Sequence, residues 1–527
     1  MNRSRPSLFA SLVLLATLAG GVRNSIAQDA AAEVFTNTSI YRIEITIPPE
    51  GVKALRTVPR QYVTGALREG SNTFAKVGIH LKGSVGSFRS IDGKPAFTIS
   101  FDKFVADQRF RSLRKIHLNN SVEDPSYMNE LIGSDTFLAA KLPAPRVSHA
   151  LVELNGRRLG LYVLKEGFTE DFLALHFRHA TGNLYDLAPG GHDVNEPMEK
   201  ALGANPEDRS DLDALAATIE EPDLAQRWAK LPRTLDLERF LSFMGVEIML
   251  GHRDGYCLAR NNFRIYHDVD SNRLVFLPHG MDVLFGNARA AIEPRMNGLA
   301  GRAVMETPEG RRAYRTRLAL LFTNVFDVPR MHSRIDRTLT GLRSVLPRDE
   351  AAALDREAVA LKERIVARAR ELKTQLAQPP LELARFVDDI AKVSGWQPFD
   401  VPDGGGLTHT NAPDGRLALA IQAGPVTAAS WRTKVLLPPG RYRFEGAIKT
   451  SGIAALPFGK NHGASVRVSG VPGVRPAGLV GEQPWKALQV TFETTAREQE
   501  VDLICDLRAS RGAAWFDSES LRLVRLK

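Results

Sequence analysis

The stretch that decides the fold reads His252-Arg253-Asp254-Gly255-Tyr256, then Asn261-Asn262, then Met281-Asp282-Val283-Leu284-Phe285-Gly286. One aspartate lies in a polar loop after an apolar segment, an asparagine pair comes shortly after it, and a second aspartate follows a strand-like run. Phosphoryl transfer from a nucleotide uses this set of groups. One Asp positions the acceptor hydroxyl, while an Asn and another Asp hold a metal ion on the phosphates. The order of these groups therefore indicates a phosphotransferase site.

The residues around this stretch have the periodicity that such a site needs. Residues 235–250 predict a helix, because apolar side chains recur on one face at Leu237, Phe240, Leu241, Met244 and Ile248. That helix runs directly into Asp254. Residues 264–267 and 274–277 then predict a hairpin, and Asp282 follows its second strand. A helix, a polar loop, a hairpin and then an Asp is the layout of the C-lobe of a kinase.

The preceding part of the chain predicts a different kind of structure. Residues 36–165 alternate as strands do, with a helix opened by Asp124-Pro125. Between two of these strands lies a loop of small residues containing Gly83 and Gly86. Backbone N–H groups in such a loop can approach a phosphate closely, and a plain flexible hairpin is the alternative. The Gly-, Pro- and Asn-rich residues 186–210 predict an inserted loop.

The sequence pattern changes from helical to strand-like in the C-terminal part of the chain. Residues 309–377 predict amphipathic helices with breaks near Pro329 and Pro347. Beyond Pro379-Pro380 the helical pattern stops, and short alternating strands predict a β-sandwich over residues 392–527. Three tryptophans of this region could stack on sugar rings or belong to the core: Trp431, Trp485 and Trp515.

The N-terminus predicts export. Arg3 and Arg5 precede the apolar run from Leu8 to Leu18, and Ser25-Ile26-Ala27 gives a cleavage point, so residues 1–27 resemble a secretory signal peptide. An uncleaved membrane anchor is the alternative. After cleavage we expect a periplasmic, cell-surface or secreted protein without a membrane span.

Charge and cysteine content exclude several classes of protein. The net charge of +9 is modest for 527 residues, and the arginines near Arg364, Arg368 and Arg370 predict solvated helix faces, so we expect no nucleic-acid partner. Cys257 and Cys505 cannot build a disulfide framework or a thiolate zinc site. We find no Ser-His-Asp elbow and no recognisable pair of catalytic acids, which disfavours a hydrolase.

Seven collinear segments between residues 75 and 290 resemble the CotH kinase family, which is named for a spore-coat protein and is related to atypical secreted protein kinases. They are Leu113 to Asn120 with Asp124-Pro125-Ser126; Pro143-Ala144-Pro145-Arg146; Leu154-Asn155-Gly156; Gly160 to Glu166; Gly182-Asn183-Leu184-Tyr185; Asn261 to Asp268; and Phe276-Leu277-Pro278 with Asp282. The C-terminal region lies outside the match and looks like the jelly-roll carbohydrate-binding modules appended to secreted enzymes.

The resemblance implies that the chain uses ATP with Mg or Mn and passes phosphate to a Ser or Thr hydroxyl of a protein. It implies that Asp254 is the catalytic Asp, and that Asn262 and Asp282 hold the metal. Lys82 and Lys94 are the candidate lysines for the phosphates, and Glu130 and Glu166 are the candidate acids that would pair with them. The oligomeric state stays open.

Three departures from the family pattern leave activity open. Only the second acid of the family's Trp-Asp-x-Asp is kept, because Gly280 stands where the first would be. The loop after Asp254 is longer than in ordinary kinases. The family's Arg-Gly before the loop of small residues is Lys82-Gly83 here, and its lysine-rich strand is thinned to Lys94. We therefore expect an α+β chain with a two-lobe kinase-like domain over residues 36–378 and an all-β jelly-roll sandwich. The alternative hypothesis is a catalytically degenerate envelope or matrix scaffold that binds polysaccharide through the sandwich.

Overall fold

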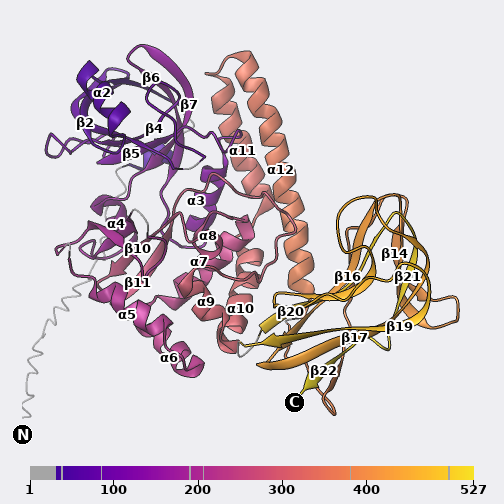
Figure 1. Cartoon of the computed structure of the whole chain (residues 1–527). Coiled ribbons are helices and arrows are strands. Elements are labelled where there is room, and N and C mark those ends of the chain that lie inside the picture. The colour runs from indigo at the N-terminus through magenta and orange to yellow at the C-terminus, as the bar shows by residue number, and fades with distance from the viewer. Residues whose placement is uncertain are drawn as a thin grey trace, which may run out of the picture. The chain divides into compact units, whose positions relative to one another are not determined.

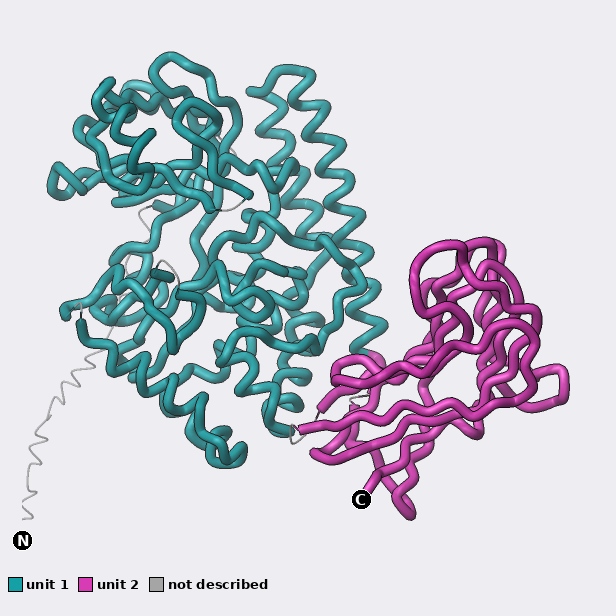
Figure 2. The backbone as a smooth tube through the Cα atoms, viewed as in Figure 1, with its two compact units in different colours: residues 1–376 teal, residues 377–527 magenta. Residues whose placement is uncertain are grey.

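The computed structural model gives two compact units, residues 1–376 and residues 377–527 (Figure 2). The expected signal peptide, residues 1–27, lies outside the residues that are described. Among those residues, none of the helices combines the length and the apolar character that crossing a bilayer requires. The structure describes residues 31–36, 40–84, 86–188, 191–205, 207–379, 381–495 and 499–527.

The first unit begins with a closed barrel of seven strands (Figure 1). Parallel pairing of the first strand with β6 closes the ring. In barrel order the strands are β1 (Tyr41–Thr46), β2 (Val63–Glu69), β3 (Asn72–Lys82), β4 (Ala96–Ser100), β5 (Lys115–Asn119), β7 (Arg157–Glu166) and β6 (Val147–Leu154). Alternation places Ile43, Ile45, Ile79 and Ile99 in one buried cluster inside the barrel.

Three short helices accompany the barrel. The first two are α1 (Ala32–Thr36) and α2 (Pro49–Thr57). The third, α3 (Asn129–Ala139), interrupts the strands between β5 and β6. The Asp124 carboxylate accepts the backbone N–H of Asn129 at 2.8 Å and that of Ser126 at 3.0 Å, so the expected Asp-Pro start does anchor this helix. Residues 129–134 of α3 are all buried, including Asn129 and Glu130 of its first turn, so the burial is not confined to one side.

The second half of the unit holds a four-stranded sheet in the order β11 (Arg273–Pro278), β10 (Phe263–Asp268), β8 (Leu184–Leu187) and β9 (Met198–Leu202). The hairpin expected at 264–277 is therefore confirmed. The expected loop over 186–210 is wrong in part, because the end of β8 and all of β9 lie within it. Pairing with β8 and its bulged register hold this Gly- and Pro-rich segment as a strand.

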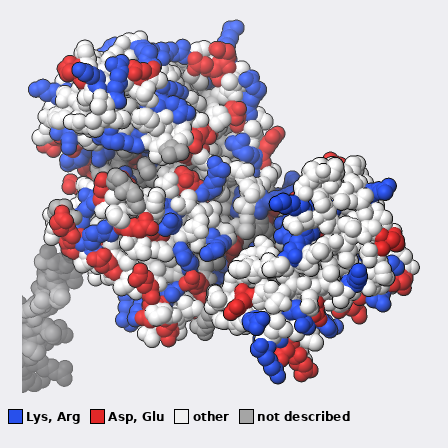
Figure 3. All heavy atoms as spheres, in the orientation of Figure 1, with Lys and Arg blue, Asp and Glu red and all other residues white. Residues whose placement is uncertain are grey.

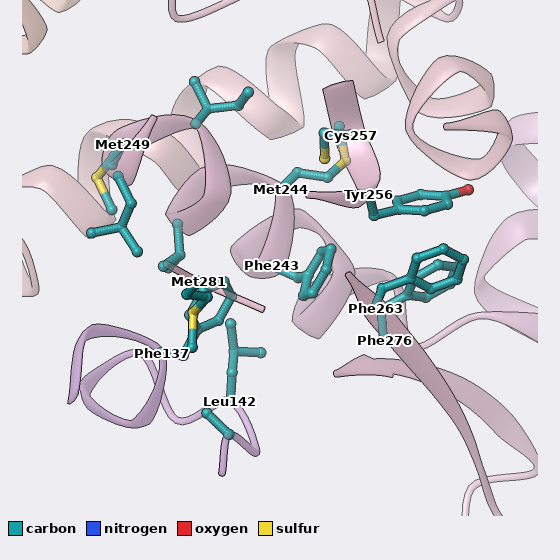
Figure 4. Close-up of a cluster of buried hydrophobic side chains, with 14 of the residues drawn as sticks. Phe137, Leu142, Phe243, Met244, Met249, Tyr256, Cys257, Phe263, Phe276 and Met281 are labelled. Atoms are coloured by element: carbon teal, nitrogen blue, oxygen red, sulfur yellow. The ribbon is translucent and has the colours of Figure 1, made fainter. Parts of the chain in front are cut away.

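Helix α7 (Leu237–Leu250) confirms the strongest helix predicted from the sequence. It is buried on all sides from Phe240 to Leu250, not along one face, because α3, α10 and β11 surround it. Figure 4 shows the packing beneath the loop that follows, where Phe243 lies near Phe276 of β11 and Phe137 of α3. Burying each such side chain contributes about 1.5–3 kcal/mol.

The remaining helices of the first unit lie on both sides of α7 in the chain. They are α4 (Glu170–His176), α5 (Ser210–Ile219), α6 (Leu224–Thr234), α8 (Tyr256–Ala259), α9 (Leu299–Met305), α10 (Pro308–Asn324), α11 (Val328–Arg343) and α12 (Arg348–Ala377). The predicted breaks at Pro329 and Pro347 are confirmed, since Pro329 lies in the first turn of α11 and Pro347 directly precedes α12. Ion pairs join α11 to α12, which run side by side in Figure 1.

The second unit is built of strands, in two sheets that share one buried core. One sheet has the order β12 (Ile390–Lys392), β22 (Arg522–Leu526), β17 (Gly440–Ala454), β21 (Arg511–Asp517), β15 (Leu417–Gln422) and β14 (Gly406–Asn411), with β19 (Gly481–Thr494) also paired to β17. The other has the order β13 (Gln397–Phe399), β16 (Thr427–Leu437), β20 (Gln499–Ala509) and β18 (Gly463–Ser469). The expected mixture of α and β structure is confirmed.

Basic and acidic side chains are intermixed over the face that Figure 3 presents, as a net charge of only +9 on 527 residues predicts. Surface ion pairs such as Arg56–Asp92 and Arg158–Glu350 contribute to this pattern. Pairs of this kind are screened by solvent and add little to stability.

Candidate functional site

The loop after α7 places Asp254 beside the asparagine pair. Gly251 ends α7 in the left-handed conformation, with φ +63°, and turns the chain toward Asp254. The Asn262 side-chain amide donates to the Asp254 Oδ2 atom at 2.6 Å and to its backbone carbonyl at 3.1 Å. Asn261 donates to the same Oδ2 at 3.1 Å. Two amides therefore fix one oxygen of a carboxylate that is itself partly exposed.

A buried glutamate supports this loop from below. Glu247 of α7 accepts the backbone N–H groups of Tyr256 at 3.0 Å and Cys257 at 2.9 Å. Burial raises the pKa of Glu247 to about 7, although these hydrogen bonds oppose the shift. Cys257 is fully buried, and burial raises the pKa of its thiol well above the usual value, which disfavours a role as a nucleophile.

Gly280 brings the hairpin's end against Asn262. The backbone N–H of His279 donates to the Asn262 carbonyl at 2.9 Å. Gly280 has φ +52°, and a Cβ atom built there would lie 2.2 Å from the Asn262 Oδ1 atom. The missing family acid thus coincides with a position where any side chain would overlap the candidate metal-side Asn. Gly280 therefore lies against Asn262, and Asp282 follows Gly280 by two residues.

Asp282 lies in a desolvated and negatively charged environment. The side-chain amide of Asn129 donates to the Asp282 carbonyl at 2.8 Å, so the first turn of α3 holds this backbone. Burial, and then the Glu130 and Glu123 charges, raise the pKa of Asp282 to about 7. The buried Asn129 Oδ1 atom has no hydrogen-bond partner. A cation would offset the cost of ionising Asp282 here, so the site fits a bound divalent metal.

The metal would take only part of its coordination shell from the protein. Across the residues that the structure describes, no group of three or more His, Cys, Asp or Glu side chains is arranged to hold a metal ion. Asp282 and the Asn262 amide oxygen supply hard oxygen ligands. Mg²⁺ is commonly bound by one or two carboxylates together with substrate phosphates and waters. The donor set suits a metal that arrives with a nucleotide.

A buried ion pair lies beside Asp282. The Lys165 ammonium group, on β7, contacts the Glu130 carboxylate at 2.9 and 3.2 Å and the His279 Nδ1 atom at 3.1 Å. The exposed fractions of the Lys165 and Glu130 side chains are 0% and 2%. Burial and the neighbouring lysines lower the pKa of His279 well below its usual value, so His279 is a neutral acceptor. Kinases need a strand Lys paired with a helix Glu, and these two residues have that arrangement.

Lys82 belongs to the same network. Its ammonium group donates to the Asn119 Oδ1 atom at 2.6 Å, and the Asn119 amide donates to Glu130 at 3.2 Å. Burial, with the Lys165 charge as the next cause, lowers the pKa of Lys82 to about 8. The structure therefore brings the candidates Lys82 and Glu130 together, and adds Lys165 to them.

Two other candidates make contacts elsewhere. Lys94 donates to the Tyr127 hydroxyl at 2.7 Å and lies 5.0 Å from the centroid of that ring. Glu166 points to the opposite side of β7 from Lys165 and pairs with Arg146 at 2.9 and 2.6 Å. Neither of them takes part in the network of Lys82, Glu130 and Lys165.

The loop of small residues that contains Gly83 and Gly86 lies near Glu123. Gly83 and Gly86 have φ +101° and +92°, which only glycine adopts readily. A Cβ atom at Gly86 would lie 2.8 Å from the Glu123 carboxylate, and Glu123 in turn raises the pKa of Asp282. Residue 85 lies outside the described residues. The loop's glycines are required by its backbone, and Gly86 lies against Glu123, whose charge acts on Asp282.

Sequence interpretation missed Lys165 although it lies in one of the collinear segments. The signal was a lysine directly after the apolar run Leu161 to Leu164, where a buried charge needs a partner. The His252 Nε2–H group donates to the His279 carbonyl, 3.2 Å away, and so ties the loop before Asp254 to the residue before Gly280.

Comparison with known proteins identifies the family. The family described as CotH kinase protein matches residues 79–383, a range that contains every site residue from Lys82 to Asp282. The chain belongs to the CotH kinase family. The resemblance noted in the sequence is thereby confirmed, and the match covers the CotH domain but not the second unit's strands beyond residue 383.

Two curated relatives resemble the CotH domain. Invasin CotH2 of Rhizopus delemar is 26% identical over 279 residues, covering 48% of this chain and 46% of that protein. Inner spore coat protein H of Bacillus subtilis is 24% identical over 313 residues, covering 54% of this chain and 83% of that protein. The match thus spans about half the length of the invasin.

Among solved structures, the Helicobacter pylori proinflammatory kinase CtkA is similar at 10% identity with a TM-score of 0.25, covering 60% of this chain and 93% of that one. A likeness at this level adds nothing to the family assignment. That assignment makes the CotH domain kinase-like.

Proposed function

We propose that the chain is an exported CotH-type protein kinase that transfers the γ-phosphoryl group of ATP to a Ser or Thr hydroxyl. The observation that carries the proposal is the meeting of Asp254, Asn262 and the segment of Asp282 next to the buried pair Lys165–Glu130. In this proposal the barrel and the helical part correspond to the two lobes of a kinase, and the second unit to an appended jelly-roll module.

Asp254 positions the acceptor. Because Asn261 and Asn262 both donate to Oδ2, that oxygen is held in place and the other oxygen is left to accept the hydroxyl proton. The carboxylate is partly exposed, so an acceptor side chain can reach it. An Asp in this role orients the nucleophile, and general-base positioning of this kind contributes about 10²- to 10⁴-fold to the rate.

Asp282 and Asn262 hold the divalent metal, Mg or Mn. When bound, the metal neutralises negative charge on the phosphate oxygens. Asp282 must lose its proton to serve as a ligand, and its pKa of about 7 places that step near neutral pH. The hydrogen bond from Asn129 keeps the Asp282 backbone in place while this occurs.

Lys82 contacts the phosphates. Lys165 uses its three N–H donors on the two Glu130 oxygens and on His279, whereas Lys82 contacts Asn119. Lys82 therefore has donors to offer, and Lys165 with Glu130 fixes the local geometry. A phosphate beside Lys82 would favour its charged form and raise its pKa from about 8.

Export rests on the N-terminal residues and is compatible with the names of the relatives, an invasin and an inner spore coat protein. The acceptor would then be an envelope, surface or secreted protein.

Nucleotide binding tests the proposal directly. ATP with Mn²⁺ is expected to raise the melting temperature, since ligand at 100 times Kd stabilises the native state by about 2.7 kcal/mol. Affinity should increase about tenfold between pH 6 and pH 8, because Asp282 has to be deprotonated to bind the metal. Differential scanning fluorimetry across a titration of ATP and Mn²⁺ at both pH values measures this.

The variant Asp282→Asn serves as the control. The phosphates of ATP still titrate in the assay, but the variant has no carboxyl group at position 282 to titrate. It should bind more weakly and lose the extra pH dependence. A wild-type protein whose melting temperature does not respond to ATP and Mn²⁺ at pH 8 would remove the proposal.

A second candidate function, polysaccharide binding by the second unit, is favoured by a cluster on the sheet that contains β21. The Arg416 guanidinium lies 5.2 Å from the centroid of Trp485 and 3.7 Å from the Asp517 carboxylate. The Trp485 indole donates to Asp414 at 2.6 Å. Trp515 lies two residues before Asp517 on β21, so its side chain shares that face. Aromatic rings beside polar groups are suited to sugar rings.

Trp431 is excluded from such a role. It is only 6% exposed, and its indole donates to the Ala420 carbonyl between the two sheets.

Pull-down on insoluble cellulose, xylan and galactan tests sugar binding. Trp485→Ala and Trp515→Ala are expected to weaken retention on the bound polysaccharide up to about tenfold, as loss of one aromatic contact predicts. Phe399→Ala, an exposed aromatic on the other sheet, is the matched control and should bind normally. Equal retention of all three variants, or no retention of the wild type, would exclude this cluster.

A further inference from the structure

The segment that follows Asp282 is held to the rest of the site by one buried arginine of α12. Arg368 donates to the Ala288 carbonyl at 2.9 Å and to the Ala290 carbonyl at 2.6 Å. It also donates to the carbonyls of Ile248 at 2.7 Å and Met249 at 3.1 Å, at the end of α7. One guanidinium group thus joins the segment after the metal-side Asp to the helix that leads into the catalytic loop.

The sequence had predicted that Arg368 lies on a solvated helix face, and that expectation is wrong. Its side chain is 0% exposed, and four of its five N–H groups are used on backbone carbonyls. Burial lowers the pKa of Arg368 to about 10, so it stays charged at neutral pH. The carbonyl end of α7 carries partial negative charge and favours a positive charge at this position.

A second contact from α12 secures the same segment two turns further on. Gln375 accepts the Ile292 backbone N–H at 3.0 Å, and its amide donates to the Ala290 carbonyl at 3.3 Å. The Tyr314 hydroxyl donates to the Ile292 carbonyl at 2.7 Å. The segment has no helix or strand of its own between β11 and α9, so these side chains supply the order that secondary structure does not.

The far end of the segment returns to the catalytic loop. Asn297 donates its backbone N–H to the Cys257 carbonyl at 2.8 Å and its side-chain amide to the Leu258 carbonyl at 2.5 Å. Residues 286–297 therefore run from just beyond Asp282 to the turn after Asp254. In the proposed reaction this is the edge of the site at which an acceptor would approach.

The composition of this segment excludes the usual way of ordering it. In many kinases the corresponding loop is ordered by phosphorylation of a hydroxyl, which creates new pairs with arginine. Residues 279–298 contain no Ser, Thr or Tyr. Here Arg368 binds backbone carbonyls, which need no modification to accept its hydrogen bonds.

We propose that Arg368 is a positioning residue that, together with Gln375, keeps residues 286–297 and the end of α7 ordered without any modification of the segment, so that the acceptor side of the site is permanently formed. The clause on the acceptor rests on the proposed kinase function. The tether itself does not, and it can be tested without nucleotide.

Hydrogen–deuterium exchange of the full-length protein without ATP tests the tether. Arg368→Lys keeps a positive charge but cannot reach four carbonyls in two segments. Amides in residues 288–292 and 249–254 are expected to exchange at least about tenfold faster. Each hydrogen bond from a charged donor stabilises the closed state by enough to slow exchange about tenfold. Arg370→Lys, on an exposed position of the same helix, should exchange as the wild type does. Unchanged exchange in Arg368→Lys overturns the proposal.

Gln375→Met is the second variant, in case Arg368→Lys does not fold. It removes two contacts to the segment and none to α7, so faster exchange confined to residues 288–292 is expected. Exchange that is equal to the wild type would again overturn the tether.

Activity separates the tether from the proposed function. With ATP and Mn²⁺, Arg368→Lys should show a lower kcat and an unchanged KM for ATP, and phosphatase treatment of the wild type should leave its activity unchanged. Loss of activity after phosphatase treatment would overturn the claim that no modification is needed. A wild-type chain that transfers no phosphate, yet whose exchange responds to Arg368→Lys, would refute the kinase proposal and leave the tether standing.

Discussion

Replacing Asp254 by Asn is expected to reduce phosphate transfer about 10²- to 10⁴-fold while the protein still binds ATP and Mn²⁺. The substitution is nearly isosteric, and its remaining carbonyl oxygen can accept the amides of Asn261 and Asn262. What it removes is the negative charge and the oxygen that would receive the acceptor proton. Transfer of radiolabelled phosphate from ATP, with wild-type and variant proteins side by side, measures the change.

The matched control for this substitution is Asp349→Asn, at an exposed position in the first turn of α12. It should leave transfer unchanged. Equal melting temperatures and equal responses to ATP with Mn²⁺ show that Asp254→Asn affects the chemical step alone. Transfer that survives this substitution at the wild-type rate would mean that another group positions the acceptor.

Lys165→Met is expected to cost about 3–5 kcal/mol of the free energy of unfolding, because it leaves the Glu130 carboxylate buried without its partner. Both side chains are almost fully buried, and Asn119 would remain as the main donor to Glu130. The same loss should abolish the response to ATP and Mn²⁺, since Lys82 is held through Asn119 and Glu130. Urea denaturation followed by circular dichroism measures the stability.

A double substitution distinguishes the ion pair from simple packing. Lys165→Met with Glu130→Leu should be less destabilised than the sum of the single variants, because neither charge is then left alone. The exposed pair Arg158–Glu350 is the comparison, and Arg158→Met should have a much smaller effect. If Lys165→Met were no more destabilising than Arg158→Met, the pair would not be the structural centre of the site.

Local sequence patterns predicted the elements that depend on nearby residues. The helix around Phe240, the hairpin before Asp282 and the helix starts at Pro329 and Pro347 all follow from periodicity or from the missing N–H of proline. The choice of Asp254, Asn262 and Asp282 as candidate site residues also came from the sequence, because they are close together in the chain and an ordered set of segments surrounds them.

The features that the sequence did not predict depend on distant partners. Lys165 can be buried because Glu130 comes from a helix 35 residues earlier, and Arg368 because its carbonyl partners lie 78 to 120 residues away. Strand β9 forms in a Gly- and Pro-rich stretch because β8 offers it a partner. A pattern within one segment contains no information about charges or strand edges that arrive from elsewhere.

The parallel contact between β1 and β6 has a consequence of its own. A sheet that closes on itself has no first or last member, so none of its seven members offers a row of vacant N–H and C=O groups to a passing polypeptide. Side-by-side aggregation through that sheet is thereby blocked by geometry rather than by surface charge. The loops at its rim can therefore change length without exposing an unpaired strand edge.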